Sequence, residues 1–151
     1  MEFTPFKLNV YMFLKLPSAF WCGVRVKTIT SQKCETVVRH RWFNQNPFRS
    51  MYFAVQAMAA EFTTGALVMY QIKKSNQNIS MLVANNKAAF TKKATGKIKF
   101  SCHDALKIEN AIKEAIESKE GQTLWLKSIG INEKGEQVSE FEFEWTIKVR
   151  S

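Results

Sequence analysis

Long apolar runs are missing from this sequence. No stretch approaches the roughly 18 apolar residues that a membrane-spanning helix requires, and Lys7 and Lys15 interrupt the apolar first 24 residues. These residues also lack the compact apolar segment and small-residue cleavage site of a secretory signal peptide. We therefore expect no membrane span, no signal peptide and a cytoplasmic protein.

Cysteine, proline and glycine are scarce as well. Three prolines and six glycines in 151 residues exclude a fibrous or linker-like chain. The cysteines Cys22, Cys34 and Cys102 are odd in number and scattered, so they predict neither a disulfide framework nor a set of metal ligands. No serine or cysteine motif accompanies His40 or His103, so neither receives a catalytic role. We expect no metal and no redox cofactor.

The chain is instead rich in apolar residues and in positive charge. Hydrophobic residues make up 46% of it, enough for one sizeable core, and no linker divides residues 1–151, so we expect a single domain. The net charge is +9, and 15 of the 22 basic residues but only 4 of the 13 acidic residues fall in residues 1–104. This favours an anionic partner, whether nucleic acid, phosphorylated cofactor or membrane surface, although solubility alone also accounts for it.

One segment predicts a buried helix. In residues 51–62 only Gln56 and Glu61 are polar, and a helix that is apolar on nearly every side must be buried all round. Ser50 can cap this helix at Met51, and we expect one helix from Met51 to about Ala66, or to Tyr70 if it runs on. A curved antiparallel sheet wrapped around it would provide the burial.

The remaining segments supply that sheet and two outer helices. Residues 138–149 alternate strictly between apolar and polar side chains, as in a strand with one core face and one wet face. The first outer helix begins at the N-cap Thr4 and ends at Pro17, and Gly121 can end the second. The other strands are expected at residues 23–30, 34–42, 79–90, 97–102 and 122–131, and the outer helices at residues 5–16 and 104–120. The sequence thus predicts an α+β protein with one six-stranded antiparallel sheet around a central helix.

This order of elements resembles the hotdog superfamily, the fold of many acyl-CoA thioesterases and hydratases. Residues 44–65, NQNPFRSMYFAVQAMAAEFTTG, resemble the loop and helix that carry an asparagine, a small-residue helix start and an acidic residue two to three turns later. The closest resemblance is to an uncharacterised bacterial branch of thioesterase-like hotdog proteins, a domain of unknown function. Many family enzymes begin this helix with a His-Gly-Gly-like turn, whereas residues 50–54 contain no glycine, so bulky side chains such as Tyr52 and Phe53 could narrow the pocket.

Glu61 is the main catalytic candidate. A carboxylate on a buried apolar helix is destabilising unless it is partnered, and desolvation raises its pKa toward the range of a general base. The resemblance implies that an acidic residue here activates water or attacks the thioester directly. The alternative is that Glu61 pairs with a basic residue such as Arg49 of a second subunit.

The asparagines before the helix are further candidates. The side-chain amide of Asn44 or Asn46 can orient water or donate to an oxyanion, although Asn-x-Asn-Pro is also ordinary turn chemistry. The helix start at Ser50 and Met51 offers free backbone N–H groups to a substrate. Gln56 is expected to bind substrate or, equally, to be a hydrogen-bonding residue of packing or of an interface.

A group of lysines surrounds one predicted strand connection. Lys92, Lys93 and Lys97 could meet the phosphates of coenzyme A there, whereas the alternative is a solvated hairpin tip. Coenzyme A would then be part of the substrate and not a cofactor.

The resemblance implies an acyl-CoA or other acyl thioester thioesterase that acts through a buried carboxylate and water. The alternative is a non-catalytic protein that binds an acyl or lipid-like molecule, favoured by the missing glycines. Nucleic acid is not expected as a partner, because the aromatic residues follow core periodicity and no RNA-binding signature is present. Hotdog domains usually pair through their sheets with sites at the seam, so a homodimer or larger homo-oligomer is expected. The edge of strand 79–90 would otherwise stay exposed.

Overall fold

Six antiparallel strands form one sheet in the computed structural model, which describes residues 2–151. In their order across the sheet, the strands are β1 (Arg25–Ile29), β2 (Cys34–Arg39), β4 (Lys97–Cys102), β5 (Gln122–Ile131), β6 (Gln137–Val149) and β3 (Ile79–Phe90). The helices are α1 (Pro5–Lys15), α2 (Pro17–Trp21), α3 (Phe53–Ser75) and α4 (Ala105–Ser118), and a short 3-10 helix, η1, spans Trp42–Asn44. The predicted α+β class and six-stranded antiparallel sheet are confirmed.

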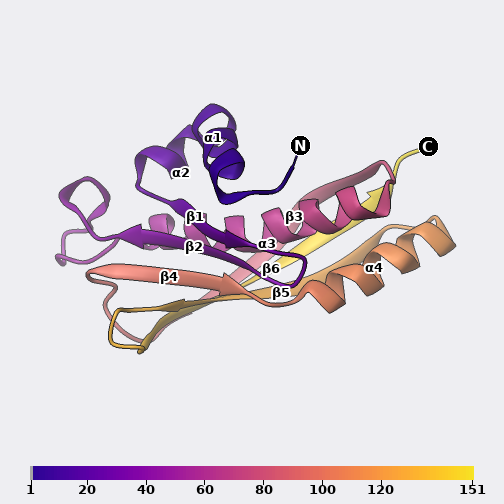
Figure 1. The fold of residues 1–151 in the computed structure, drawn as a ribbon. Coiled ribbons are helices and arrows are strands. Elements are labelled where there is room, and N and C mark those ends of the chain that lie inside the picture. Colours follow the sequence, from indigo (N-terminus) through magenta and orange to yellow (C-terminus); the bar gives the residue numbers. More distant parts are fainter. Residues whose placement is uncertain (1) are drawn as a thin grey trace.

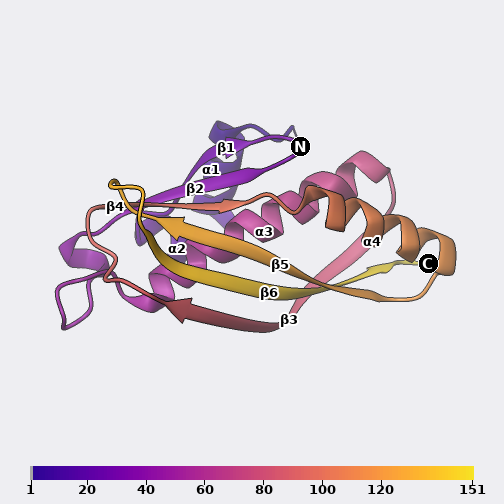
Figure 2. The same cartoon turned by 90° about the horizontal axis from the view of Figure 1, so that it is seen from below.

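The long helix α3 lies along the inner face of the curved sheet (Figures 1 and 2). Between Ala59 and Val68, every residue of this helix except Glu61 is buried. Small side chains allow the sheet to approach, and α4 packs against α3 and β5. The predicted central helix is therefore confirmed.

Buried hydrogen bonds fix α3 against the strands. The Trp145 Nε1 of β6 donates to Thr64 Oγ1 over 2.9 Å, and Thr36 Oγ1 of β2 donates to the Ala59 carbonyl over 2.9 Å. Phe141 and Phe143 are buried on the same face of β6 as Trp145, as the alternation predicted. These directional contacts set the rotation of α3, which apolar packing alone would leave less well defined.

The edge of the sheet formed by β3 is open. This strand pairs only with β6, and all of its residues from 84 to 90 are exposed. A long strand of this kind offers unpaired backbone groups to another chain.

The start of α3 differs from the sequence expectation. Its N-cap is Tyr52 and not Ser50. Met51 precedes the helix and forms an isolated β-bridge with Gln45. The buried Ser50 hydroxyl bonds to Asn46 instead of capping the helix. The helix also runs past both Ala66 and Tyr70, to Ser75.

Two other helix ends differ as well. Pro17 does not only end the first helix but also begins the short helix α2, because proline fits the first turn of a new helix. The αL residue after α4 is Lys119, with a φ of 58°, and not Gly121. None of the helices in residues 2–151 is both long and apolar enough to cross a membrane.

Candidate functional site

A cavity with a volume of about 540 Å³ lies at the start of α3. Loop residues before α3, the first turns of α3 and the connection after β3 enclose it. Its walls include six residues that the sequence placed at the site, namely Asn46, Ser50, Met51, Gln56, Lys92 and Lys93. We call it the helix-start cavity.

Asn46 organises the loop that forms one wall of this cavity. Its Oδ1 accepts from the backbone N–H of Phe48 over 2.9 Å, and its Nδ2 donates to Ser50 Oγ over 3.0 Å. The Met51 N–H donates to the carbonyl of Ala94 across the cavity wall. The loop is therefore tied to both sides of the cavity, and the Asn46 amide already has protein partners.

Gln56 differs from Asn46 because its amide is not satisfied. The side chain is only 4% exposed, and its Oε1 has no hydrogen-bond partner within residues 2–151. An unpaired buried acceptor destabilises a protein by about 1–3 kcal/mol, so such an atom calls for a ligand or an ordered water. Gln56 is the polar group of the helix-start cavity that is best placed to meet one.

Aromatic side chains supply much of the remaining wall. Tyr52 and Phe53 pack edge to face with centroids 5.1 Å apart, and Phe53 contacts Phe90 in the same way at 6.3 Å. These three rings are 46–54% exposed. Tyr52 and Phe53 stand where the resemblance implied glycines, and together with Phe90 they give the cavity an apolar mouth.

Glu61 lies in a different place from these residues. It lines a second cavity of about 230 Å³ with Met58, Phe62 and the chain from Lys15 to Ala19. Five residues of α-helix turn a side chain by about 140°, so Gln56 and Glu61 point away from each other. The structure therefore does not bring Glu61 together with the predicted asparagines within one chain.

Burial dominates the electrostatics of Glu61. The side chain is half-buried, and burial raises its pKa, with no hydrogen bond or opposite charge within residues 2–151 to offset the effect. Its Oε1 and the Trp145 ring both lie against Gly65, where an added Cβ would come within 3.1 Å of the ring. A raised pKa is the direction of shift that a carboxylate needs to act as a general base near neutral pH.

Asn44 is occupied by the protein itself. Its Nδ2 donates to the carbonyls of Cys22 and Arg39, and its Oδ1 accepts from the Arg41 N–H, all within 2.8–2.9 Å. The side chain is 3% exposed. This geometry favours the turn interpretation of Asn44 over a catalytic one.

The predicted lysine group is split by the structure. Lys92 forms an ion pair with Glu136, and Lys93 donates to the Phe48 carbonyl over 3.2 Å. Lys97 lies at neither place, because it lines another pocket with the side chains of β1 and β2. The three lysines therefore do not form one phosphate site.

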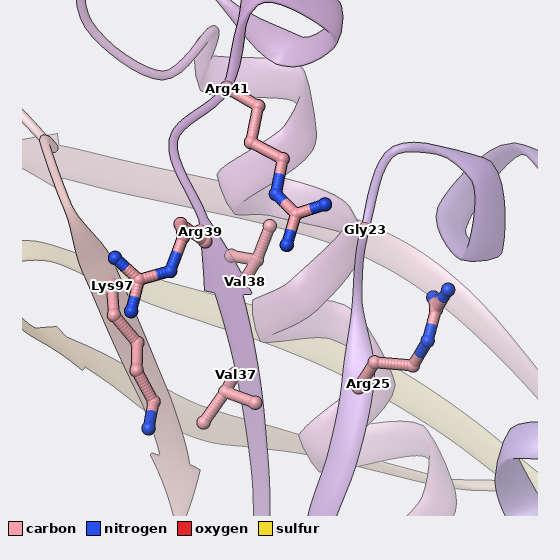
Figure 3. Close-up of a pocket in the computed structure, with 7 residues that line it drawn as sticks. All are labelled: Gly23, Arg25, Val37, Val38, Arg39, Arg41 and Lys97. Carbon is pink, nitrogen blue, oxygen red and sulfur yellow. The ribbon is translucent and has the colours of Figure 1, made fainter.

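The pocket that contains Lys97 was not expected from the sequence. It has a volume of about 300 Å³, and its cationic residues are Arg25, Arg39, Arg41 and Lys97 (Figure 3). The alternation within residues 23–30 and 34–42 is the signal that could have found it. The registers that pair Arg25 with Val37 and Arg39 with Lys97 place these three charges on one face. Arg41 lies two residues beyond the end of β2. We call this the basic pocket.

Among residues 2–151, no three His, Cys, Asp or Glu side chains gather as metal ligands would. Cys34 and Cys102 face each other across β2 and β4 as free thiols, and burial raises the pKa of Cys102 to about 12. A thiol of this kind is not a nucleophile at neutral pH.

A family model described as a domain of unknown function (DUF4442) matches residues 7–147. The chain belongs to this family. No curated protein matches it in sequence.

This DUF4442 chain is similar to several solved structures. One is a protein of unknown function and probable thioesterase from Pseudomonas aeruginosa, with a TM-score of 0.83 and 21% identity over 97% of both chains. A protein of unknown function from Chlorobaculum tepidum has a TM-score of 0.82 and 16% identity, and the match covers 95% of this chain and 93% of that one. A thioesterase from Haemophilus influenzae has a TM-score of 0.75 and 10% identity, and the match covers 99% of this chain and 93% of that one. These similarities, at TM-scores of 0.75 to 0.83, show that the chain shares the fold of these structures.

Proposed function

We propose that this DUF4442 protein hydrolyses acyl thioesters, with the acyl group in the helix-start cavity and Glu61 as the base that activates water. The observation that carries the proposal is Gln56 in the wall of that cavity, a buried residue whose side-chain Oε1 has no hydrogen-bond partner within residues 2–151. An acceptor there can hold the attacking water, and the amide nitrogen beside it can donate to the thioester oxygen. The apolar mouth suits an acyl chain.

A complete site of this kind needs two copies of the chain. Glu61 and Gln56 line separate cavities in one copy, and the resemblance implies that hotdog sites form where two sheets join. We propose that two copies pair along the open edge of β3, so that Glu61 of one copy serves the helix-start cavity of the other. Light scattering should then report twice the chain mass of 17.4 kDa. If light scattering shows a monomer at micromolar concentration, the site is not shared between two copies of the chain.

The catalytic test is Glu61→Gln, which keeps the shape and removes the base. Hydrolysis of short, medium and long acyl-CoAs should fall by about 100-fold or more, while thermal melts show a folded protein. Glu114→Gln on the exposed side of α4 is the matched control and should retain full activity. Unchanged hydrolysis by folded Glu61→Gln protein contradicts the role of Glu61.

The structure also supports a second candidate, a non-catalytic acyl-binding protein. Tyr52 and Phe53 fill the place of the glycines that let a thioester approach the helix backbone. If the wild-type protein binds acyl-CoA but hydrolyses none of the three chain lengths, this second function replaces the first.

A further inference from the structure

The basic pocket places like charges against one another on the outer face of the sheet. Arg39 of β2 and Lys97 of β4 are directly opposite in the antiparallel register. Arg25 of β1 is opposite Val37, two residues along β2 from Arg39, and therefore lies on the same face. Directly opposed like charges destabilise a sheet. The pairing of Arg39 with Lys97 therefore lowers the stability of the fold instead of supporting it.

Little negative charge offsets this cluster. The carboxylate nearest to it is Glu133, whose Oε1 lies 3.9 Å from Arg39 Nη1, with both side chains more than half exposed. The same oxygen accepts from the Lys97 backbone N–H over 3.0 Å, so Glu133 is held at the rim. An exposed ion pair of this length contributes little to stability, which leaves most of the positive charge available.

The arginines are held in place by other parts of the chain. The Arg25 guanidinium donates to the carbonyls of Phe20 and Val24, each over 2.7 Å, and stacks on the Phe20 ring at 3.6 Å. Burial and the nearby charge of Arg41 lower the pKa of Arg25. Figure 3 shows the guanidinium groups of Arg39 and Arg41 on either side of Val38.

We propose that the basic pocket binds a phosphate or diphosphate group of an anionic ligand. Guanidinium groups match phosphate oxygens with two parallel hydrogen bonds, and several of them around one cavity suit a multiply charged group. Val37, on the same face of β2 as Arg39, gives the pocket an apolar floor. The phosphate belongs either to the coenzyme A of a thioester substrate or to a separate phosphorylated molecule, and only the first source rests on the proposed function.

The direct test measures the binding of inorganic pyrophosphate by calorimetry. The double variant Arg39→Gln, Arg41→Gln should bind it at least about tenfold more weakly than the wild type. Arg150→Gln, an exposed site after β6, is the control and should leave the affinity unchanged. Glu133→Gln keeps the oxygen that accepts from Lys97 but removes the rim charge, so it should bind pyrophosphate more tightly.

Thermal melts separate binding from folding in the same variants. Relief of the repulsion between Arg39 and Lys97 predicts that the double variant melts at the same temperature as the wild type or higher. Equal pyrophosphate affinity in the wild type and this folded variant overturns the proposal. Failure of the wild type to bind pyrophosphate at millimolar concentration overturns it as well.

Two thioesters then identify the source of the phosphate. If coenzyme A supplies it, the double variant should raise KM for acyl-CoA and leave KM for the matching acyl-pantetheine, which lacks phosphate, unchanged. If a separate molecule supplies it, pyrophosphate binding is lost while both KM values stay the same. Should the protein hydrolyse neither thioester, the proposed function fails, and the pyrophosphate measurement still decides the basic pocket.

Discussion

The helix-start cavity and the basic pocket are built in opposite ways. The first has an aromatic wall and one buried amide without a partner, whereas the second is open to one face of the sheet and bears four cationic side chains. The loop from His40 to Tyr52 connects β2 to α3 and leads from one to the other. This difference is the basis of our two proposals: an apolar chain beside α3 and a phosphate on the outer face.

The comparison also shows two ways in which a fold can hold an unfavourable arrangement. In the helix-start cavity a buried acceptor lacks a hydrogen bond, and in the basic pocket like charges oppose each other across two strands. Each arrangement destabilises the unliganded protein, and a ligand of matching chemistry removes the penalty. Variants that remove either arrangement should therefore gain stability and lose binding.

The largest expected effect comes from Gln56→Met. This change removes the unpartnered amide at similar length, so hydrolysis should fall by about 100-fold, while the protein gains about 1 kcal/mol in unfolding free energy. Gln71→Met is the matched control on the same helix, because Gln71 is equally buried but donates to the Ser31 carbonyl over 2.7 Å. It should lose stability and keep activity. Denaturant melts with steady-state kinetics measure both, and a Gln56→Met protein that is less stable contradicts the interpretation.

The separation of the two cavities on α3 depends on the rotation of that helix, which Thr64→Val tests. The change leaves the indole N–H of Trp145 without its acceptor, and we expect a loss of about 1–3 kcal/mol. Thr146→Val on the other face of β6 should cost much less. If both variants unfold at the same denaturant concentration, the Trp145 bond does not fix the helix.

Salt should separate the two cavities by their chemistry. Pyrophosphate binding to the basic pocket should weaken about fivefold from low to physiological ionic strength, because exposed charges are screened. Binding of an uncharged acyl-pantetheine to the helix-start cavity should change little or strengthen slightly. Calorimetric titrations at two salt concentrations measure both, and equal salt dependence would remove the distinction.

The smallest expected effect is the pH dependence of stability at Glu61. Burial raises the pKa of Glu61, so between the ordinary pKa of a glutamate and this raised value the folded chain holds a proton that the unfolded chain has released. Stability therefore falls as pH rises through this window. Glu61→Gln should melt higher than the wild type at neutral pH, and the difference should vanish below the ordinary pKa. A Gln variant that is less stable at neutral pH indicates a basic partner, such as Arg49 of a second copy.

Several parts of the fold could be predicted from local patterns. The strict alternation along β6 predicted a strand with one core face. The nearly all-apolar start of α3 predicted a buried helix, because burial follows from the spacing of apolar residues. The strands at residues 79–90, 97–102 and 122–131 are confirmed at the expected boundaries. Helix ends were less predictable, since Ser50 has the right chemistry for a cap but Asn46 engages its hydroxyl.

The candidate site was predictable in its members but not in its grouping. The sequence indicated Gln56 and Glu61 because both are polar residues on an otherwise apolar helix. In the structure Gln56 is buried and Glu61 is half-buried. Their assignment to different cavities depends on the rotation of α3, which the bonds to Trp145 and Thr36 set from distant strands. The basic pocket depends in the same way on strand register.

By itself, the sequence determined the α+β class, the buried helix and the identity of the polar residues on that helix, because these follow from local periodicity. Only the tertiary structure decided which side chains share a cavity, since neighbours such as Arg39 and Lys97 are far apart in the chain and meet through register alone. It also decided which polar groups have partners: the Asn44 amide is satisfied by the backbone of Cys22, Arg39 and Arg41, whereas the Gln56 oxygen has no partner within residues 2–151. Satisfaction of a polar atom is a property of everything packed around it, and no local pattern contains that information.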